Sequence, residues 1–190
     1  MTLDRLFLFI ALLLASALAQ AQGSGFYLGG ALGQSKLKDW CSGASATAFF
    51  NACNDTDTAW KLLGGYRFNR YVGVEASYID WGEVTASVTV SGTVAEVAAK
   101  QQSYGLAAVG TLPIGERFEL FGKAGFLMTQ QQTTSANVPN PRTVDRDESE
   151  LHYGLGARFL FTKSWALRGE WENTDKLKVE MLSLGVEYRF

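Results

Sequence analysis

Charged side chains recur at alternate positions in this sequence, within stretches whose other positions are apolar. On the expected strands, eleven of them share one face: Lys61, Arg67, Glu75, Glu119, Lys123, Arg158, Arg168, Glu170, Glu172, Glu187 and Arg189. Five are carboxylates and six are bases, so their charges nearly cancel if they face a common interior. A selective pore would need a ring of one sign. The near balance therefore favours a lumen plugged by a network of paired charges.

A narrow gated channel is the alternative function for the same charges. Eight strands enclose an interior that side chains just fill. An unpaired charge in such an interior would cost several kcal/mol, so we expect the charges to be paired. A closed lumen is the preferred interpretation, and a low-conductance ion or solute pore is kept as the alternative.

His152 is the only histidine in the sequence, and a catalytic site would depend on it. A barrel enzyme that modifies lipopolysaccharide needs a nucleophile or a base at the rim of the barrel. Tyr153 and Gly154 follow His152, so there is no His-x-Ser pair, and strand alternation turns the imidazole inward, away from lipid. We expect a hydrogen-bonded luminal histidine, no enzymatic activity, no cofactor and no metal. A barrel enzyme is the least favoured alternative.

The elements that position these residues are expected to be β-strands, because apolar and polar residues alternate at the period of an extended chain. The eight stretches are about 25–34, 59–68, 71–81, 99–112, 117–130, 148–161, 164–173 and 181–190. The last is the most regular, with one face made of Leu182, Leu184, Val186, Tyr188 and Phe190. The pattern predicts an all-β fold, an eight-stranded antiparallel up-and-down transmembrane β-barrel.

The polarity of the two strand faces decides between a membrane barrel and a soluble one. In the phase that we assign, no charged residue lies at the centre of the apolar face, where a basic side chain facing lipid costs roughly 2–4 kcal/mol. A soluble lipocalin-like barrel would use the opposite phase, and alternation alone permits both. Aromatic residues at the strand ends favour the membrane phase, because interfacial girdles are aromatic. They are Phe26, Phe68, Phe118, Phe161, Trp165 and Phe190 at one end, and Trp60 and Trp171 at the other.

Residues 1–21 are predicted to be a cleaved signal peptide. A short n-region is followed by an apolar run, and Ala19, Gln20 and Ala21 form an A-x-A cleavage site. Residues 22–190 would then form the barrel domain of an exported protein. The formal net charge of -2 gives no sign of a nucleic-acid partner.

Connections between the expected strands alternate between long and short. Long polar segments (35–58, 82–98 and 131–147) follow the first, third and fifth strands, and short turns follow the second, fourth and sixth. Because outer-membrane barrels have long surface loops and short periplasmic turns, both termini are expected on the periplasmic side of the bacterial outer membrane. A Val/Thr/Ser alternation in 82–98 would extend the third and fourth strands above the membrane. The long loops are where a surface ligand would be contacted.

Three segments resemble OmpA-type transmembrane domains, a family of eight-stranded outer-membrane β-barrel proteins. They are GGYRFNRYVGVEASY (64–78), RGEWEN (168–173) and MLSLGVEYRF (181–190). The resemblance implies that Glu75, Arg168 and Glu170 belong to the charged luminal network of that family. Lys123 stands where a basic residue is usual. Arg158 departs from the family, which typically has a glutamate there, as does Val109, where a lysine is usual.

The resemblance also implies the partners of the protein. Tyr188 and Phe190 would belong to the signal that the barrel-assembly machinery reads during biogenesis. The barrel would lie among outer-membrane lipid and lipopolysaccharide. The sequence stops at Phe190, so we do not expect the cell-wall tethering of the longer family members. We expect an integral outer-membrane protein with a structural and surface-presentation role.

Cys41 and Cys53 are the two cysteines of the sequence, and both lie in the first long polar segment. Exported chains cross an oxidising compartment, where two such cysteines usually pair. The bridge would close a loop of about 13 residues, worth roughly 3 kcal/mol by the chain-entropy model. We expect the oxidised protein to show no free thiol. A thiol titration that finds two would contradict the pairing.

Overall fold

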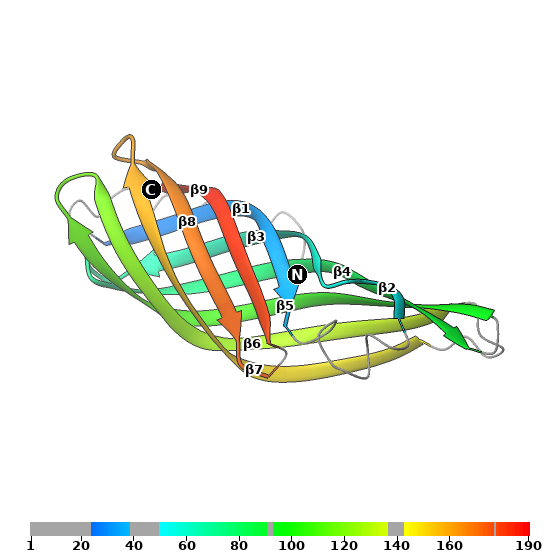
Figure 1. Ribbon diagram of the computed structural model, residues 1–190. Coiled ribbons are helices and arrows are strands. Elements are labelled where there is room, and N and C mark those ends of the chain that lie inside the picture. Colours follow the sequence, from blue (N-terminus) through cyan, green and yellow to red (C-terminus); the bar gives the residue numbers. More distant parts are fainter. Residues whose placement is uncertain (1–23, 39–49, 91–92, 137–142, 177) are drawn as a thin grey trace, which may run out of the picture.

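Every element that the structure describes is a β-strand. The computed structural model describes residues 24–38, 50–90, 93–136, 143–176 and 178–190. Its strands are β1 (Gly25–Leu37), β2 (Phe50–Asn54), β3 (Thr56–Arg67), β4 (Val72–Val90), β5 (Thr93–Ile114), β6 (Phe118–Ala136), β7 (Thr143–Leu160), β8 (Trp165–Thr174) and β9 (Val179–Arg189) (Figure 1). Within these ranges, no helix is long and apolar enough to cross a bilayer.

Eight of the nine described strands close into a barrel. Each pairs antiparallel with its neighbours, and β9 returns to β1 with Tyr27 opposite Arg189 and Leu37 opposite Val179. In lipid every backbone group needs a partner within the protein, and a closed sheet leaves no free edge. The predicted eight-stranded antiparallel barrel is confirmed. β2 lies outside this ring and pairs with the far part of β4.

The barrel strands have two lengths. β1, β3, β8 and β9 have 10 to 13 residues, close to the roughly 9–11 that a tilted strand needs to cross a bilayer. β4 to β7 have 18 to 22 residues and run on past the others, as Figure 1 shows. We call these continuations, together with β2, the outer sheet. It begins where the β4–β5 register shifts between Asp80 and Glu83, beside Gly82 with its positive φ of 83°.

The predicted strand extension over 82–98 is confirmed. The predictions of loops at 35–58 and 131–147 are wrong in part. In the segment 131–147, residues 131–136 continue β6 and residues 143–147 begin β7. The segment 35–58 holds β2 and the ends of β1 and β3. These strand ends carry polar residues at successive positions, so the apolar alternation that reveals a lipid-facing strand is lost.

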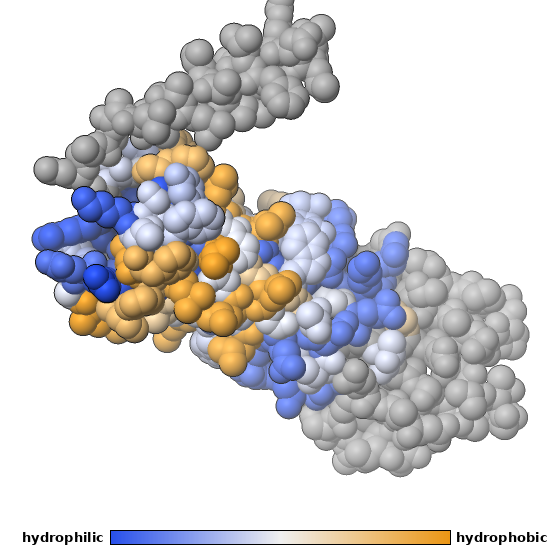
Figure 2. Space-filling view, turned by 90° about the horizontal axis from the view of Figure 1, so that it is seen from above, coloured by the Kyte–Doolittle hydropathy of each residue, from blue (hydrophilic) through white to orange (hydrophobic). Residues whose placement is uncertain are grey.

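Large apolar side chains cover the outside of the barrel. Leu32, Phe126 and Met128 expose 65 to 68% of their surface, whereas Lys61 and Glu75 on the inner face expose 1%. Figure 2 shows the apolar residues as a band with polar residues on either side. The phase with apolar residues outside is therefore confirmed, and the lipocalin-like phase is excluded.

Aromatic rings gather at both ends of the apolar band. At the short-turn end, the ring centroids of Trp165 and Tyr188 lie 4.9 Å apart. At the end nearer the outer sheet, those of Tyr78 and Tyr104 lie 5.2 Å apart. Aromatic girdles of this kind mark the two membrane–water interfaces. The membrane-crossing part of the barrel lies between them.

The closed ring of backbone hydrogen bonds should survive mild detergent denaturation. We expect the folded protein to migrate in an unheated dodecyl sulfate gel at a different apparent mass from the boiled protein, because closure removes the edges from which a sheet unravels. The same migration before and after boiling would contradict a closed barrel.

Candidate functional site

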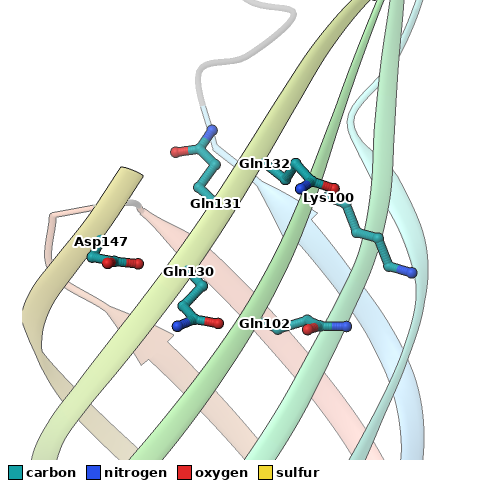
Figure 3. Close-up of a pocket in the computed structure, with 6 residues that line it drawn as sticks. All are labelled: Lys100, Gln102, Gln130, Gln131, Gln132 and Asp147. Atoms are coloured by element: carbon teal, nitrogen blue, oxygen red, sulfur yellow. The ribbon is translucent and has the colours of Figure 1, made fainter. Parts of the chain in front are cut away.

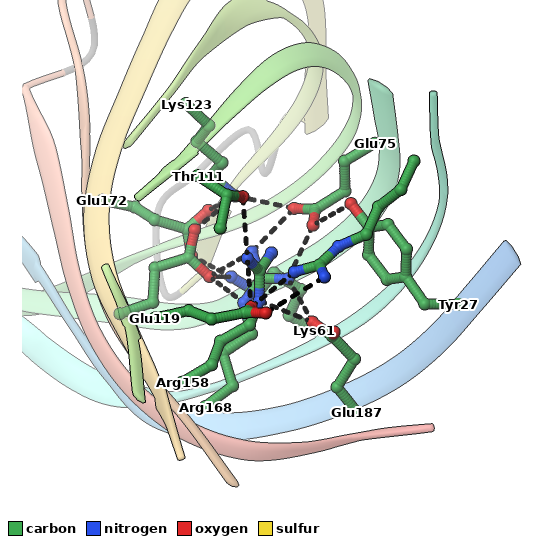
Figure 4. Close-up of polar contacts among 12 residues, drawn as sticks. Tyr27, Lys61, Glu75, Thr111, Glu119, Lys123, Arg158, Arg168, Glu172 and Glu187 are labelled. Atoms are coloured by element: carbon green, nitrogen blue, oxygen red, sulfur yellow. Dashed lines mark hydrogen bonds and ion pairs between the residues drawn. The ribbon is translucent and has the colours of Figure 1, made fainter. Parts of the chain in front are cut away.

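The polar interior of the barrel is the candidate functional site. Its charged side chains come from six strands, β3, β4, β6, β7, β8 and β9, and meet across the lumen (Figure 4). Nine of the eleven predicted residues are buried: Lys61, Glu75, Glu119, Lys123, Arg158, Arg168, Glu170, Glu172 and Glu187. Arg67 and Arg189 are partly exposed. β5 instead turns small and apolar residues inward, among them Ala107 and Val109.

Arg168 lies at the centre of this network. Its guanidinium donates to both oxygens of Glu75, with Nη1–Oε2 2.6 Å and Nη2–Oε1 2.9 Å. The same side chain lies 3.0 Å from Glu170 Oε2 and 3.3 Å from Glu187 Oε2. The hydroxyl of Tyr27 donates to Glu75 Oε2 at 3.0 Å. This two-pronged geometry is the strong form of an arginine–carboxylate pair.

Two lysines hold the side of the network that is nearer the outer sheet. Lys61 Nζ lies 2.6 Å from Glu170 Oε2 and also bonds Glu172. Lys123 Nζ lies 2.7 Å from Glu170 Oε1 and 2.6 Å from Glu172 Oε1. His152 Nε2 is 3.0 Å from Glu172 Oε1. The single histidine therefore contacts the charge network inside the barrel.

Glu119 collects the charges at the short-turn end. Arg67 donates to it through Nη1 at 3.2 Å and Nη2 at 2.5 Å, and Arg189 does so at 3.0 and 2.7 Å. Arg189 Nε also lies 2.9 Å from Glu187 Oε1. Arg158 Nε donates to Glu187 Oε2 at 2.8 Å, which links this end to the centre. Arg158, the departure from the family pattern, is thus paired with a carboxylate of β9, although its Nη2 has no hydrogen-bond partner in the described residues.

An aromatic ring supports the two central guanidinium groups. The centroid of Phe121 lies 4.0 Å from Arg158 Cζ and 4.4 Å from Arg168 Cζ. A cation over a ring face gains roughly 0.5–2 kcal/mol, more when the pair is desolvated. Phe121 shares a strand face with Glu119 and Lys123, so alternation places it inward, but the sequence does not show that its ring contacts the two guanidinium groups.

Each of two luminal rings covers a glycine on the neighbouring strand. Tyr27 lies opposite Gly65, and Phe121 lies opposite Gly156. A Cβ atom at Gly65 would stand 2.3 Å from Tyr27 Cζ, and one at Gly156 would stand 2.4 Å from Phe121 Cζ. No larger residue fits under either ring. The glycines let the rings lie flat in the lumen.

A buried apolar layer lies in the barrel between the charges and the outer sheet. It is the buried cluster of Ala59, Ile79, Trp81, Leu127, Val179 and Met181. The register sets Ile79 opposite Lys61 and Met181 opposite Glu172, so the layer borders the lysine end of the network. The sequence analysis missed this layer. Leu127 gave the one signal, because it makes residues 126–128 an apolar run that breaks the alternation.

A chain of hydrogen bonds crosses the wall of this layer. Trp81 Nε1 donates to Ser103 Oγ at 2.7 Å, the hydroxyls of Ser103 and Thr129 lie 2.7 Å apart, and Thr129 donates to Glu150 Oε1 at 3.1 Å. Glu150 is buried and was also missed, although it stands two residues before His152 on the same face. It brings the described interior to six carboxylates and six bases.

The other predicted site residues fall outside this network. Cys41 lies outside the described residues, as does the side chain of Cys53, so their pairing stays a prediction. Tyr188 and Phe190 lie on the outer face with ring centroids 5.0 Å apart. Their part in assembly stays a prediction too. Among the described side chains, no group of three or more His, Cys, Asp or Glu could hold a metal ion.

One curated protein is similar to this chain over nearly all of the chain's length. Outer membrane protein A of Yersinia pseudotuberculosis serotype I (strain IP32953) is 30% identical over 201 residues, which cover 95% of this chain and 53% of that protein. The chain therefore spans about half the length of this relative.

Two solved structures share the fold. Ail, the attachment invasion locus protein of Yersinia pestis, is 21% identical with a TM-score of 0.55, over 89% of this chain and 99% of that one. OprG from Pseudomonas aeruginosa is 14% identical with a TM-score of 0.59, over 89% and 96%. At these identities the likeness shows the fold alone.

The family model for the outer membrane protein beta-barrel domain matches residues 6–190. That match spans all of the strands whose closure and apolar outer face are described above. The chain belongs to this family of outer-membrane β-barrels, of the OmpA type, and is a protein of the bacterial outer membrane.

Proposed function

We propose that the protein is a sealed anchor: a barrel whose lumen does not conduct, and which holds the outer sheet beyond the membrane. The observation that carries this proposal is the filling of the lumen by a balanced charge network and an adjoining apolar layer. The structural and presentation roles both follow from it, since the barrel offers no path through itself and its long strands end outside.

The charge network opposes conduction through its pairing. A selective pore presents one sign of charge to a passing ion. Here Arg168 is flanked by Glu75, Glu170 and Glu187, and Lys123 by Glu170 and Glu172. An ion entering this region would have to separate buried ion pairs. Each separated charge would lose the partner that offsets its desolvation, at a cost of several kcal/mol.

The apolar layer opposes conduction by a different physical effect. Hydrophobic constrictions close pores because water leaves them. Ile79, Leu127 and Met181 are 0 to 1% exposed, so the layer is packed shut. The lumen is therefore closed twice, once by charge pairing and once by exclusion of water.

Two parts of the proposal concern biogenesis. Residues 1–21 would be removed as a signal peptide on export. Tyr188 and Phe190 would present the assembly signal, which is supported by their outward position on β9, the strand that closes the barrel against β1. His152 supports no enzymatic role, because its imidazole is 2% exposed and contacts Glu172.

The purified barrel should show no steady unitary current in a planar lipid bilayer at moderate voltage, because both closures must open before an ion can pass. A porin measured under the same conditions serves as the positive control. Stable, long-lived channels from the pure protein would overturn the sealed lumen and favour the pore.

Replacing Glu75 by alanine should destabilise the barrel, because Arg168 and Lys123 lose a buried partner and Tyr27 loses its acceptor. Removing one partner of a buried ion pair typically costs about 3–5 kcal/mol. Urea unfolding in detergent, followed by tryptophan fluorescence, measures the change. Glu116→Ala, an exposed carboxylate in the turn before β6, is the matched control and should change stability by under about 0.5 kcal/mol. Equal stability of the two variants would show that the network does not hold the barrel together.

A further inference from the structure

A polar pocket lies on the outer sheet, outside the lumen. It has a volume of about 460 Å³ and is lined by Lys100, Gln102, Gln130, Gln131, Gln132 and Asp147 (Figure 3). Gln102 and Gln130 share the outward face of their strands with Tyr104 and Met128, two residues nearer the barrel. The pocket is therefore on the side of the sheet that continues the lipid-facing wall.

The strand register aligns five of the six lining residues in two rows, while Gln131 belongs to the opposite face of β6. Gln102 on β5 lies opposite Gln130 on β6, which lies opposite Asp147 on β7. One step farther out, Lys100 lies opposite Gln132. Cross-strand neighbours of this kind have Cβ atoms about 4.5–5.5 Å apart. The rows thus form a continuous polar surface across three strands.

The chemistry of this surface suits sugar hydroxyls better than phosphates. Each glutamine amide both donates and accepts, as a hydroxyl does, and Asp147 adds acceptors. Lys100 is the one base among the six lining residues that the structure describes. Asp80 holds the Gln102 amide at 3.2 Å and brings a further carboxylate to the row. A phosphate would meet more negative than positive charge here.

The position of the pocket relative to the lipid-contact surface indicates the source of its ligand. Leu106 and Phe126, each 65% exposed, lie four residues nearer the barrel centre on the same faces. At about 3.3 Å per residue, the first row starts roughly 7 Å along the strand beyond Tyr104 of the aromatic girdle. That is the depth of the lipid headgroups. The pocket is continuous with the lipid-contact surface, so it faces the headgroups of the outer leaflet.

We propose that this pocket binds the saccharide headgroup of an outer-leaflet glycolipid, through hydrogen bonds from sugar hydroxyls to Gln102 and Gln130. The site is separate from the sealed lumen. It gives the outer sheet a defined lipid neighbour and fixes how the sheet sits on the membrane surface.

The test compares the double variant Gln102→Ala/Gln130→Ala with Gln34→Ala, an exposed glutamine on β1 that does not line the pocket. The full chain, folded in detergent micelles, is titrated with three probes: lipopolysaccharide that carries its complete core oligosaccharide, lipid A without core sugars, and the free core oligosaccharide. We expect the double variant to lose about tenfold in affinity for the complete lipopolysaccharide, as loss of two hydrogen-bonding amides implies. Its affinity for lipid A, and the affinities of Gln34→Ala, should change less than about twofold.

Three results would overturn the assignment. Unchanged affinity of the double variant for complete lipopolysaccharide would show that the pocket does not bind it. An equally large loss for lipid A shows that lipid A itself, and not the core oligosaccharide, is recognised. A loss confined to the free oligosaccharide makes the ligand a soluble glycan. Each variant is first checked for the heat-dependent gel shift, and if the double variant does not fold, Gln130→Ala alone should lose about threefold. Bilayer conductance tests the lumen separately, since neither residue faces it.

Discussion

Twelve charged side chains line the described interior of this barrel, ten of them buried, and the rest of the structure depends on how they are neutralised. Taking a charge out of water costs several kcal/mol unless its partners are well placed. Glu75 and Arg168 meet across 93 positions of sequence, so the pair ties β4 to β8 through the centre of the lumen. Eight strands are the number that brings opposite walls close enough for such contacts. Fold closure and charge pairing therefore require each other.

The described interior contains two groups of side chains, one charged and one apolar, which differ in their affinity for water. The charged side chains of the network favour water, although most of their described polar atoms bond one another, whereas the apolar layer around Leu127 disfavours water. The polar chain from Trp81 to Glu150 runs across neighbouring strands beside this layer, so the indole nitrogen is satisfied where it would otherwise be buried in apolar surroundings. Eight strands enclose an interior that is just wide enough for side chains to fill.

The parts that the sequence predicted are those where the environment differs between the two strand faces. Leu182 and Leu184 meet lipid while Glu187 meets the lumen, and this contrast fixes strand, phase and burial together. Where both strand faces are polar, as in residues 131–136, the difference in polarity between the faces disappears, and the pattern predicts a loop in place of the strand. Within the lumen, alternation finds the inward charges but not their partners, because pairing depends on contacts across the barrel.

Apolar inward residues were missed for a related reason. Strand alternation places Phe121 and Leu127 on the inner face with Lys123, but their apolar type does not indicate what they contact there. Glu150 lies near the start of the expected strand 148–161, on the face of His152, and its contact with Thr129 could not be read from the sequence. In each case the sequence lacks the contacts across the barrel interior: which strands a side chain reaches and which residues it packs against.

The rings of Tyr27 and Phe121 lie where a side chain on the opposite glycine would have to be. The substitutions allowed at each glycine therefore depend on the ring that covers it. A change from Gly65 to a larger residue is tolerable only if Tyr27 shrinks as well. A Cβ atom at Gly156 would also stand 2.5 Å from the backbone oxygen of Gly169, so a smaller residue at position 121 would not make room for it. Among descendants of this sequence, Gly65 and Tyr27 should be kept or lost together, on strands that lie side by side in the barrel and far apart in the chain, whereas Gly156 should be kept.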